Sequence, residues 1–313
     1  MGNGADLLFP HLGIVIEKMV DHFTVFGFEV KFYGLIIGMA FLIGMFICEW
    51  DAKRRGQNAD DYWDCFILMA ILGVIGARLY YVLFSWSYYS QNPGEILNIR
   101  GGGLAIYGAV IGGAIGVFIV AHKKKRNGFE MLDSIMPALL FGQVMGRWGN
   151  FFNCEAFGEY TDSLLAMRIK KSLVYPDSIT ALMKENLIVE NGIEYIQVHP
   201  TFLYESLWNL VSIFIVLWYG KRVQKFKGEI VCLYMVTYGI GRSIIEGLRT
   251  DSLYVGNTGI RVSQLLSMFL VVIGAGVIIY NRFVRKSRAE VAATETTKAT
   301  AAGEASAEEN SEE

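Results

Sequence analysis

Long apolar segments separated by short charged loops limit most strongly how this chain of 313 residues can fold. About 20 consecutive apolar residues suffice to cross a bilayer as an α-helix. Hydrophobic residues make up 53% of the chain and charged residues only 19%, which is low for a soluble protein. The pattern predicts an all-α, polytopic membrane protein. Its seven expected transmembrane helices are Phe32–Trp50, Phe66–Trp86, Leu104–Ala121, Met131–Phe152, His199–Tyr219, Ile230–Leu248 and Val262–Tyr280.

The regions outside these helices indicate how the rest of the chain is organised. Apolar residues from Leu12 to Phe23 recur at roughly helical spacing, which favours a short amphipathic helix on the membrane surface. A polar insert containing an Asn191-Gly192 turn predicts a small extracytoplasmic head of mixed structure. Alanine, threonine, serine and glutamate at the end of the chain indicate disorder. The expected parts are an N-terminal interfacial segment at 1–31, membrane helices at 32–158, the head at 159–198, membrane helices at 199–288 and a disordered acidic tail at 289–313.

Four short basic loops predict the orientation of the chain in the membrane. They carry 15 of the 28 lysines and arginines, and all fall on one side if seven helices cross. The positive-inside rule puts that side in the cytoplasm, with the N-terminus and the head outside and the C-terminus inside. These loops are 53–55, 123–126, 221–227 and 282–288.

The segment Gly146–Gly158 brings several polar groups into or next to an apolar helix. They are Arg147, Asn150, Asn153 and Glu155. An arginine within a bilayer costs about 2.5–3.5 kcal/mol on insertion scales, so intramembrane charges mark functional sites by default. Two interpretations without function are an arginine that reaches a lipid head group and a buried Arg–Glu pair that only fixes packing.

A second charged cluster lies on the sixth expected helix. Tyr238, Arg242, Glu246 and Arg249 are separated by four, four and three residues, so they share one helix face. We expect Arg242 to meet Arg147 across one outward-facing cavity, with a lipid phosphate between the two guanidinium groups. Arginine binds phosphate through a planar, permanently charged fork. Glu155 and Glu246 are candidate partners, and the alternative is an internal Arg–Glu network that holds helices together.

Other single residues have two open interpretations each. Tyr33 is either an aromatic anchor at the membrane interface or part of a lipid site. Arg78 lies deep in the second expected helix and needs a partner or a polar cavity. His199 and Glu205 stand at the outer entrance of the fifth helix, where Glu205 can pair with Arg78 or with an outer arginine. A capping and packing role for these two residues is equally open.

Composition excludes several classes of function. Four isolated cysteines and four histidines show no paired or metal-ligand spacing, so neither a disulfide framework nor a metal site is expected. The net charge of −2 provides no basic patch for nucleic acid. The N-terminus lacks the pattern of a removable signal peptide. Glycines at 108, 112 and 116 have the four-residue spacing of closely packed membrane helices.

The motif Gly-Arg-x-Gly-Asn-Phe-x-Asn-x-Glu-x-x-Gly across Gly146–Gly158 resembles the signature of the bacterial phosphatidylglycerol–prolipoprotein diacylglyceryl transferase family. The resemblance extends in order over residues of about 30–280. The supporting matches are Tyr33-Gly34, Gly76-Ala77-Arg78, Gly101 to Leu104, His199-Pro200 with Tyr204-Glu205, and Tyr238 through Arg242 and Glu246 to Arg249.

The resemblance implies a multi-pass enzyme of the bacterial cytoplasmic membrane. Such an enzyme transfers the diacylglyceryl group of phosphatidylglycerol to the lipobox cysteine in the signal peptide of a preprolipoprotein. A thioether forms and glycerol phosphate leaves, in the first step of lipoprotein maturation; membrane lipids surround the site and no cofactor is expected. By resemblance, Arg147 contacts the phosphatidylglycerol head group, and Arg242, Asn150, Glu155 and Tyr33 occupy positions regarded as important.

One position departs from the family pattern. Many members have a histidine shortly after the glycine triplet, often discussed as the base that takes the thiol proton, and this chain has Tyr107 there. Tyrosine, with a pKa of about 10, is a poor base near neutral pH. Water, the lipid phosphate and Tyr107 itself are therefore the candidate acceptors, while Arg147 and Arg242 are expected to supply electrostatic activation.

The residues alone leave two other classes of function open. A transporter or lipid flippase that uses the arginines as an anion path predicts inverted repeats and interrupted helices, which are not evident by inspection. A membrane scaffold without chemistry would not require matched arginines, asparagines and a glutamate at one depth.

Overall fold

The computed structural model describes residues 4–99, 102–254, 256 and 258–284. Within them, seven helices of at least 18 residues coincide with the seven predicted apolar segments. They are α1 (Phe32–Arg54), α2 (Asp60–Phe84), α4 (Ile106–Lys123), α5 (Gly128–Phe152), α7 (Thr201–Arg222), α8 (Glu229–Glu246) and α9 (Val262–Ile279). The proposed acidic tail at 289–313 lies outside the described residues.

Five of the long helices in the described part are apolar and long enough to cross a membrane, as expected of a polytopic membrane protein. They are α1, α2, α4, α7, and α9 continued to Val284. The other two, α5 and α8, contain buried charged side chains, among them Asp133 on α5 and Glu229 and Glu246 on α8. The shorter helical segments are α3 (Trp86–Tyr89), η1 (Pro93–Leu97), η2 (Lys171–Leu173), η3 (Pro176–Ser178), α6 (Ala181–Glu185) and η4 (Tyr280–Val284).

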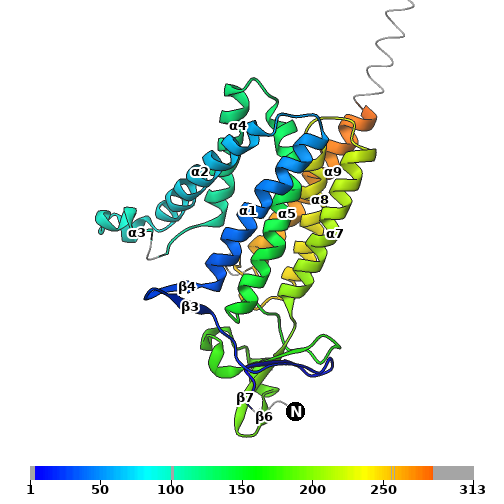
Figure 1. Cartoon of the computed structure of the whole chain (residues 1–313). Helices are drawn as coiled ribbons and strands as arrows, with labels where there is room; N and C mark the ends of the chain where they lie inside the picture. Colours follow the sequence, from blue (N-terminus) through cyan, green and yellow to red (C-terminus); the bar gives the residue numbers. More distant parts are fainter. Residues whose placement is uncertain (1–3, 100–101, 255, 257, 285–313) are drawn as a thin grey trace, which may run out of the picture.

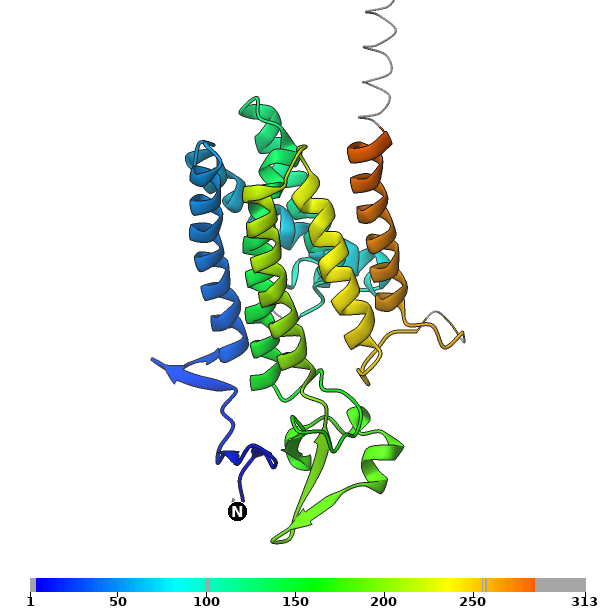
Figure 2. The ribbon, with the colours of Figure 1, turned by 90° about the vertical axis from the view of Figure 1, so that its right-hand side faces the viewer.

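The long helices form one bundle with a paired extension. Helix α1 packs on α5, α5 on α7, α7 on α8 and α8 on α9. Figure 2 shows this row with α1 in blue and α9 in orange at its two edges. Helices α2 and α4 form a separate tight pair beside it (Figure 1).

Glycines allow the α2–α4 pair to pack backbone against backbone, as their spacing predicts. A Cβ atom added to Gly112 would lie 2.1 Å from the carbonyl oxygen of Leu72, and one added to Gly108 would lie 2.1 Å from that of Gly76. The two helices would have to move apart to make room for either Cβ atom. Close packing of this kind replaces the hydrophobic driving force that is missing between helices in lipid.

A β-sheet domain covers one end of the bundle (Figure 1). Its five antiparallel strands have the order β2-β1-β5-β7-β6. Leu7, Ile169, Ile196 and Val198 point into its hydrophobic core and are fully buried. The strands are β1 (Leu7–Phe9), β2 (Ile14–Ile16), β5 (Met167–Lys170), β6 (Ile188–Glu190) and β7 (Ile193–Val198).

The N-terminal segment differs from its prediction. The amphipathic helix expected between Leu12 and Phe23 is wrong, because β1 and β2 of this segment complete the sheet of the head. The hairpin of β3 (His22–Val25) and β4 (Phe28–Lys31) then leads directly into α1. An all-α fold is therefore corrected to a helical bundle with a β-sheet head. Short apolar runs fit a strand or a helix equally well, and the pairing with β5 decides between them.

We predict that Gly112→Ala lowers the thermal midpoint of the detergent-purified protein by several degrees, because its methyl group forces α2 and α4 apart. The matched control is Gly276→Ala on α9, where an added Cβ meets nothing within 4 Å. Circular dichroism measures both midpoints. Equal midpoints for the two variants would show that the glycine contact does not hold the pair.

Candidate active site

The signature segment forms the end of α5 and a tight turn after it. Cys154 and Ala156 both adopt left-handed backbone angles, with φ of 50° and 57°, and this turn directs Glu155 back toward the helix. Its Oε1 atom accepts hydrogen bonds from Asn150 Nδ2 at 2.9 Å and Asn153 Nδ2 at 3.2 Å. Three of the predicted site residues thus bind one another. Glu155 was predicted to pair with an arginine, but within the described residues these two amides hold it instead.

The last glycine of the motif lets three chain segments meet beneath the bundle. The amide of Gly158 donates to the carbonyl oxygen of His199 at 2.9 Å, and Gly158 pairs with Arg249 in an isolated bridge. A Cβ atom at Gly158 would lie 2.7 Å from His199 Cβ and 2.9 Å from Leu248 O. The motif is therefore fixed directly against the start of α7 and the end of α8.

Glu205 on α7 is the carboxylate on which the arginines converge. Its side chain is 4% exposed, and its Oε2 atom lies 2.8 Å from Arg147 Nε on α5. Its Oε1 atom accepts hydrogen bonds from Arg242 Nη1 on α8 at 2.8 Å and from Arg249 Nη1 at 3.4 Å. One buried carboxylate thus joins three segments and keeps three like charges together. Arg147 and Arg242 contact the same carboxylate, whereas the outward-facing cavity expected between them stays a prediction. Glu205 pairs with these arginines and not with Arg78.

Further carboxylates complete this cluster. Arg242 Nη2 lies 2.7 Å from Glu246 Oε2, close enough for an ion pair although the N–H points off the hydrogen-bonding direction. Arg249 forms a two-pronged interaction with Asp251, with distances of 2.9 and 2.7 Å. Glu246 was predicted as an arginine partner and is one. Three cations facing three carboxylates offset part of the cost of burying these charges.

Arg147 is the most exposed of the three arginines and has unused hydrogen-bonding capacity. A guanidinium group has five N–H donors. Arg147 Nε forms the ion pair with Glu205, and one Nη1 hydrogen is donated to Asn150 Oδ1 at 3.2 Å. Its Nη2 makes no hydrogen bond within the described residues. Its side chain is 21% exposed, against 12% for Arg242 and 10% for Arg249. The Nη edge of Arg147 is therefore the part of the cluster best able to bind an anion.

Aromatic and amide side chains extend the cluster toward the middle of the bundle. Tyr238 stacks on Tyr234 with ring centroids 5.5 Å apart, and the Tyr234 hydroxyl accepts a hydrogen bond from Gln143 Nε2 at 2.8 Å. Gln143 lies one turn before Arg147, and its Oε1 atom is buried without a partner in the described part of the chain. Sequence reasoning missed Gln143 and Tyr234. Gln143 lies four residues before Arg147, and Tyr234 lies four residues before Tyr238. This helical spacing could have indicated that they share a face with the predicted site residues.

Tyr33 lies beside the signature segment. A Cβ atom added to Gly149 of α5 would lie 2.6 Å from Tyr33 Cδ2, so the tyrosine ring rests on the helix surface left open by this glycine. The Tyr33 side chain remains partly exposed. This position is compatible with both sequence interpretations.

Arg78 lies in a different environment, among backbone carbonyl groups. Its Nε donates to Ile96 O at 2.7 Å and its Nη2 to Glu95 O at 2.6 Å. Its Nη1 donates to the carbonyl oxygens of Gly102 and Gly103, both at 2.9 Å. Arg78 thus fastens the loop between α3 and α4 to α2, and none of these contacts involves the Glu205 cluster.

Two other predicted residues lie at the margins of the cluster. Tyr107 on α4 packs near Tyr80, with ring centroids 6.1 Å apart, and is within electrostatic range of Tyr238. His199 Nδ1 lies 3.3 Å from the Tyr204 hydroxyl, at the junction of the head with α7. Burial lowers the pKa of His199, which favours a neutral imidazole at neutral pH.

The bundle and this cluster together define a polytopic membrane protein with a charged site near the head. Residues 21–280 match the family model described as prolipoprotein diacylglyceryl transferase. A protein of Finegoldia magna named phosphatidylglycerol–prolipoprotein diacylglyceryl transferase is 39% identical over 264 residues, covering 84% of this chain and 95% of the relative. A protein of the same name from Streptococcus agalactiae is 42% identical over 257 residues, covering 82% and 93%. The chain belongs to the prolipoprotein diacylglyceryl transferase family.

We predict that Glu205→Gln destabilises the protein by about 3–5 kcal/mol, because it leaves buried arginines without their shared counter-charge. Equilibrium unfolding in mixed micelles measures the loss. Glu49→Gln is the matched control, since Glu49 pairs with the largely exposed Lys53 and its loss should change the stability much less. Similar losses in both variants would contradict a central role for Glu205.

Proposed function

We propose that this chain transfers the diacylglyceryl group of phosphatidylglycerol to the cysteine thiol of the lipobox in preprolipoproteins. The family match and the names of the relatives support the reaction. The observation on this chain that carries the proposal is the Nη edge of Arg147, which remains available beside a buried arginine cluster. A phosphodiester is the natural ligand of such an edge.

The reaction is a substitution at the terminal glycerol carbon of the diacylglyceryl group. A carbon–sulfur bond forms, the carbon–oxygen bond to phosphate breaks, and glycerol phosphate leaves with the electron pair. The phosphate gains negative charge as this bond breaks. Arg147, oriented by Glu205 and Asn150, therefore stabilises the transition state more than the bound lipid, which is the condition for catalysis. Arg242 contributes the second positive charge and is fixed between Glu205 and Glu246.

The thiol needs little help to ionise. With an ordinary pKa of about 8.5, a few per cent is thiolate at neutral pH, and nearby arginines increase that fraction. The proton passes to water or to the departing phosphate, whose new dianionic form is the stronger base. Asn150, Asn153 and Glu155 shape the turn that faces the head group, and Tyr33 and Tyr238 supply its aromatic borders. His199 and Arg249 hold the head against the outer end of the site.

The proposed orientation follows from the charge distribution. All seven long helices cross a bacterial cytoplasmic membrane, with the head and the N-terminus outside and the C-terminus inside. The basic residues of the 53–55, 123–126 and 221–227 loops lie at the end of the bundle opposite the head, which supports this assignment (Figure 1). The signal peptide then enters the membrane from the cytoplasmic side and presents its cysteine near the outer end of α5.

We predict that Arg147→Ala and Arg147→Lys lower the transfer rate to a lipobox peptide by at least about 100-fold, because neither provides the phosphate fork. Arg242→Ala should abolish transfer as well. Mass spectrometry of the peptide after incubation with phosphatidylglycerol measures the reaction. Arg222→Ala, an exposed change at the other end of the bundle, is the control and should keep normal activity. Near-normal transfer by a folded Arg147 variant would overturn the proposal.

We predict that Tyr107→Phe retains partial activity, since a phenol is not required to accept the thiol proton in this scheme. The pH dependence of the transfer rate should keep its shape. Tyr175→Phe on the exposed surface of the head serves as the control. Complete loss of transfer in Tyr107→Phe alone would instead assign the proton transfer to this tyrosine.

A further inference from the structure

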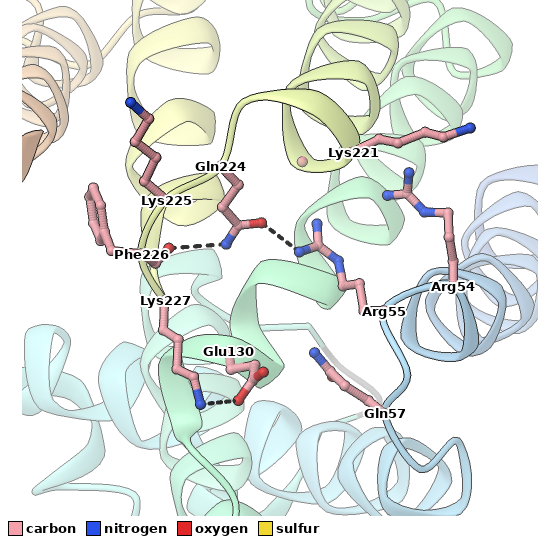
Figure 3. Close-up of a pocket in the computed structure, with 10 residues that line it drawn as sticks. Arg54, Arg55, Gln57, Glu130, Lys221, Gln224, Lys225, Phe226 and Lys227 are labelled. Carbon is pink, nitrogen blue, oxygen red and sulfur yellow. Dashed lines mark hydrogen bonds and ion pairs between the residues drawn. The ribbon is translucent and has the colours of Figure 1, made fainter.

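A hollow of about 460 Å³ opens at the end of the bundle opposite the Glu205 cluster. It lies where the end of α1, the start of α5 and the α7–α8 loop come together (Figure 3). This volume is in the range of small-molecule sites. The hollow is lined by Arg54, Arg55, Gln57, Glu130, Gly220, Lys221, Gln224, Lys225, Phe226 and Lys227.

The lining of this hollow is strongly basic. It contains five cationic side chains and a single carboxylate, Glu130, which binds Lys227 at 2.6 Å. Behind the wall, Asp51 neutralises part of the charge of Arg54 and Arg55. Within the described residues, Lys221 and Lys225 make no ion pair. Positive charge therefore exceeds negative charge around the hollow.

The inner wall of the hollow is held in place by hydrogen bonds. Arg55 donates from Nε to Asp51 at 2.5 Å and from Nη1 to Gln224 Oε1 at 2.6 Å. Gln224 in turn donates to Asp133 Oδ2 at 2.6 Å. Asp133 is fully buried and also accepts the backbone N–H groups of Gly228, Ile230 and Val231 at the start of α8. This chain of contacts fixes the guanidinium group of Arg55.

The rim of the hollow is adaptable. Lys221 lies in the last turn of α7 and Lys225 in the α7–α8 loop, and Figure 3 shows their ammonium groups directed away from the centre. Four-carbon side chains can turn toward an anion at small cost. Arg55 Nη2 is buried with no hydrogen-bond partner in the described part of the chain. A fixed guanidinium wall with mobile ammonium groups at the rim is suited to a phosphate.

The hollow differs from the neighbouring α4–α5 loop in how its cations are paired. On the neighbouring α4–α5 loop, Arg126 pairs with Asp61 at 3.0 Å and Lys124 with Asp64 at 2.7 Å. Those cations are neutralised individually by acidic residues at the start of α2. Around the hollow, five lining cations instead share one lining carboxylate, Glu130.

We propose that this hollow binds a phosphate-bearing anion, either the head group of an anionic phospholipid or a free phosphate compound. The inference is independent of the proposed transfer reaction, which takes place at the opposite end of the bundle. Binding here would brace α1 against α7 and the start of α8. Helices α7 and α8 carry Glu205 and Arg242 toward their other ends.

The test compares Lys221→Gln/Lys225→Gln with the matched control Lys53→Gln/Lys123→Gln, which removes two positive charges at the same end outside the hollow. The full chain is placed in nanodiscs of zwitterionic lipid. Thermal midpoints are measured during titration with inorganic phosphate at constant ionic strength. A second set of nanodiscs contains increasing amounts of phosphatidylglycerol in chloride buffer. Transfer to a lipobox peptide is measured in parallel.

The thermal midpoint of the wild type and of the control should rise to a plateau with added ligand. The Lys221→Gln/Lys225→Gln variant of the hollow should need at least tenfold more ligand for the same rise. A response confined to the phosphate series would identify a free phosphate compound as the ligand, and a response in the lipid series would identify the head group. Identical titration curves for both double variants in both series would overturn the proposal. The Lys221→Gln/Lys225→Gln variant is expected to retain transfer. Absence of transfer in the wild type would therefore count against the proposed reaction and not against the hollow.

Discussion

The convergence of three arginines on the single buried carboxylate of Glu205 is the interaction on which the rest of the structure depends. A guanidinium group within a helical bundle costs several kcal/mol unless it is paired and hydrogen-bonded. Glu205 contacts Arg147 and Arg242 at 2.8 Å on two different helices, so neither helix can rotate without exposing an unpaired charge. The cluster therefore fixes the relative rotation of α5, α7 and α8. It also orients the unused edge of Arg147, on which the proposed binding of an anionic lipid depends.

The head contributes by fixing where α7 begins. Strand β7 ends at Val198, and α7 starts three residues later at Thr201, so the sheet sets the height of Glu205. Gly158 packs against His199 and Leu248 in the same place, which ties the signature turn to both neighbouring helices. The N-terminal strands complete this sheet. Their pairing with β5 links the start of the chain to the frame of the site.

Most of the helical bundle and part of the site could be predicted from the sequence, for physical reasons that differ from residue to residue. Apolar length predicted the long helices, and the spacing of Arg242 and Glu246 predicted their shared face. The partner of Glu205 stayed undecided between Arg78 and an outer arginine, because that depends on helix rotation. Leu7 and Ile169 are far apart in the chain and are paired only by folding, so the strands of the head were missed. The carbonyl contacts of Arg78 depend on a loop conformation that spacing does not encode.

A double-mutant cycle tests the bridging role of Glu205 most directly. Glu205→Gln, Arg147→Gln and the double variant would be unfolded at equilibrium in mixed micelles, and the cycle repeated with Arg242→Gln. Direct contact predicts a coupling free energy of about 1–3 kcal/mol in each cycle, because residues in one charged network do not act additively. Additive losses within about 0.3 kcal/mol in both cycles would show that Glu205 does not join the two arginines.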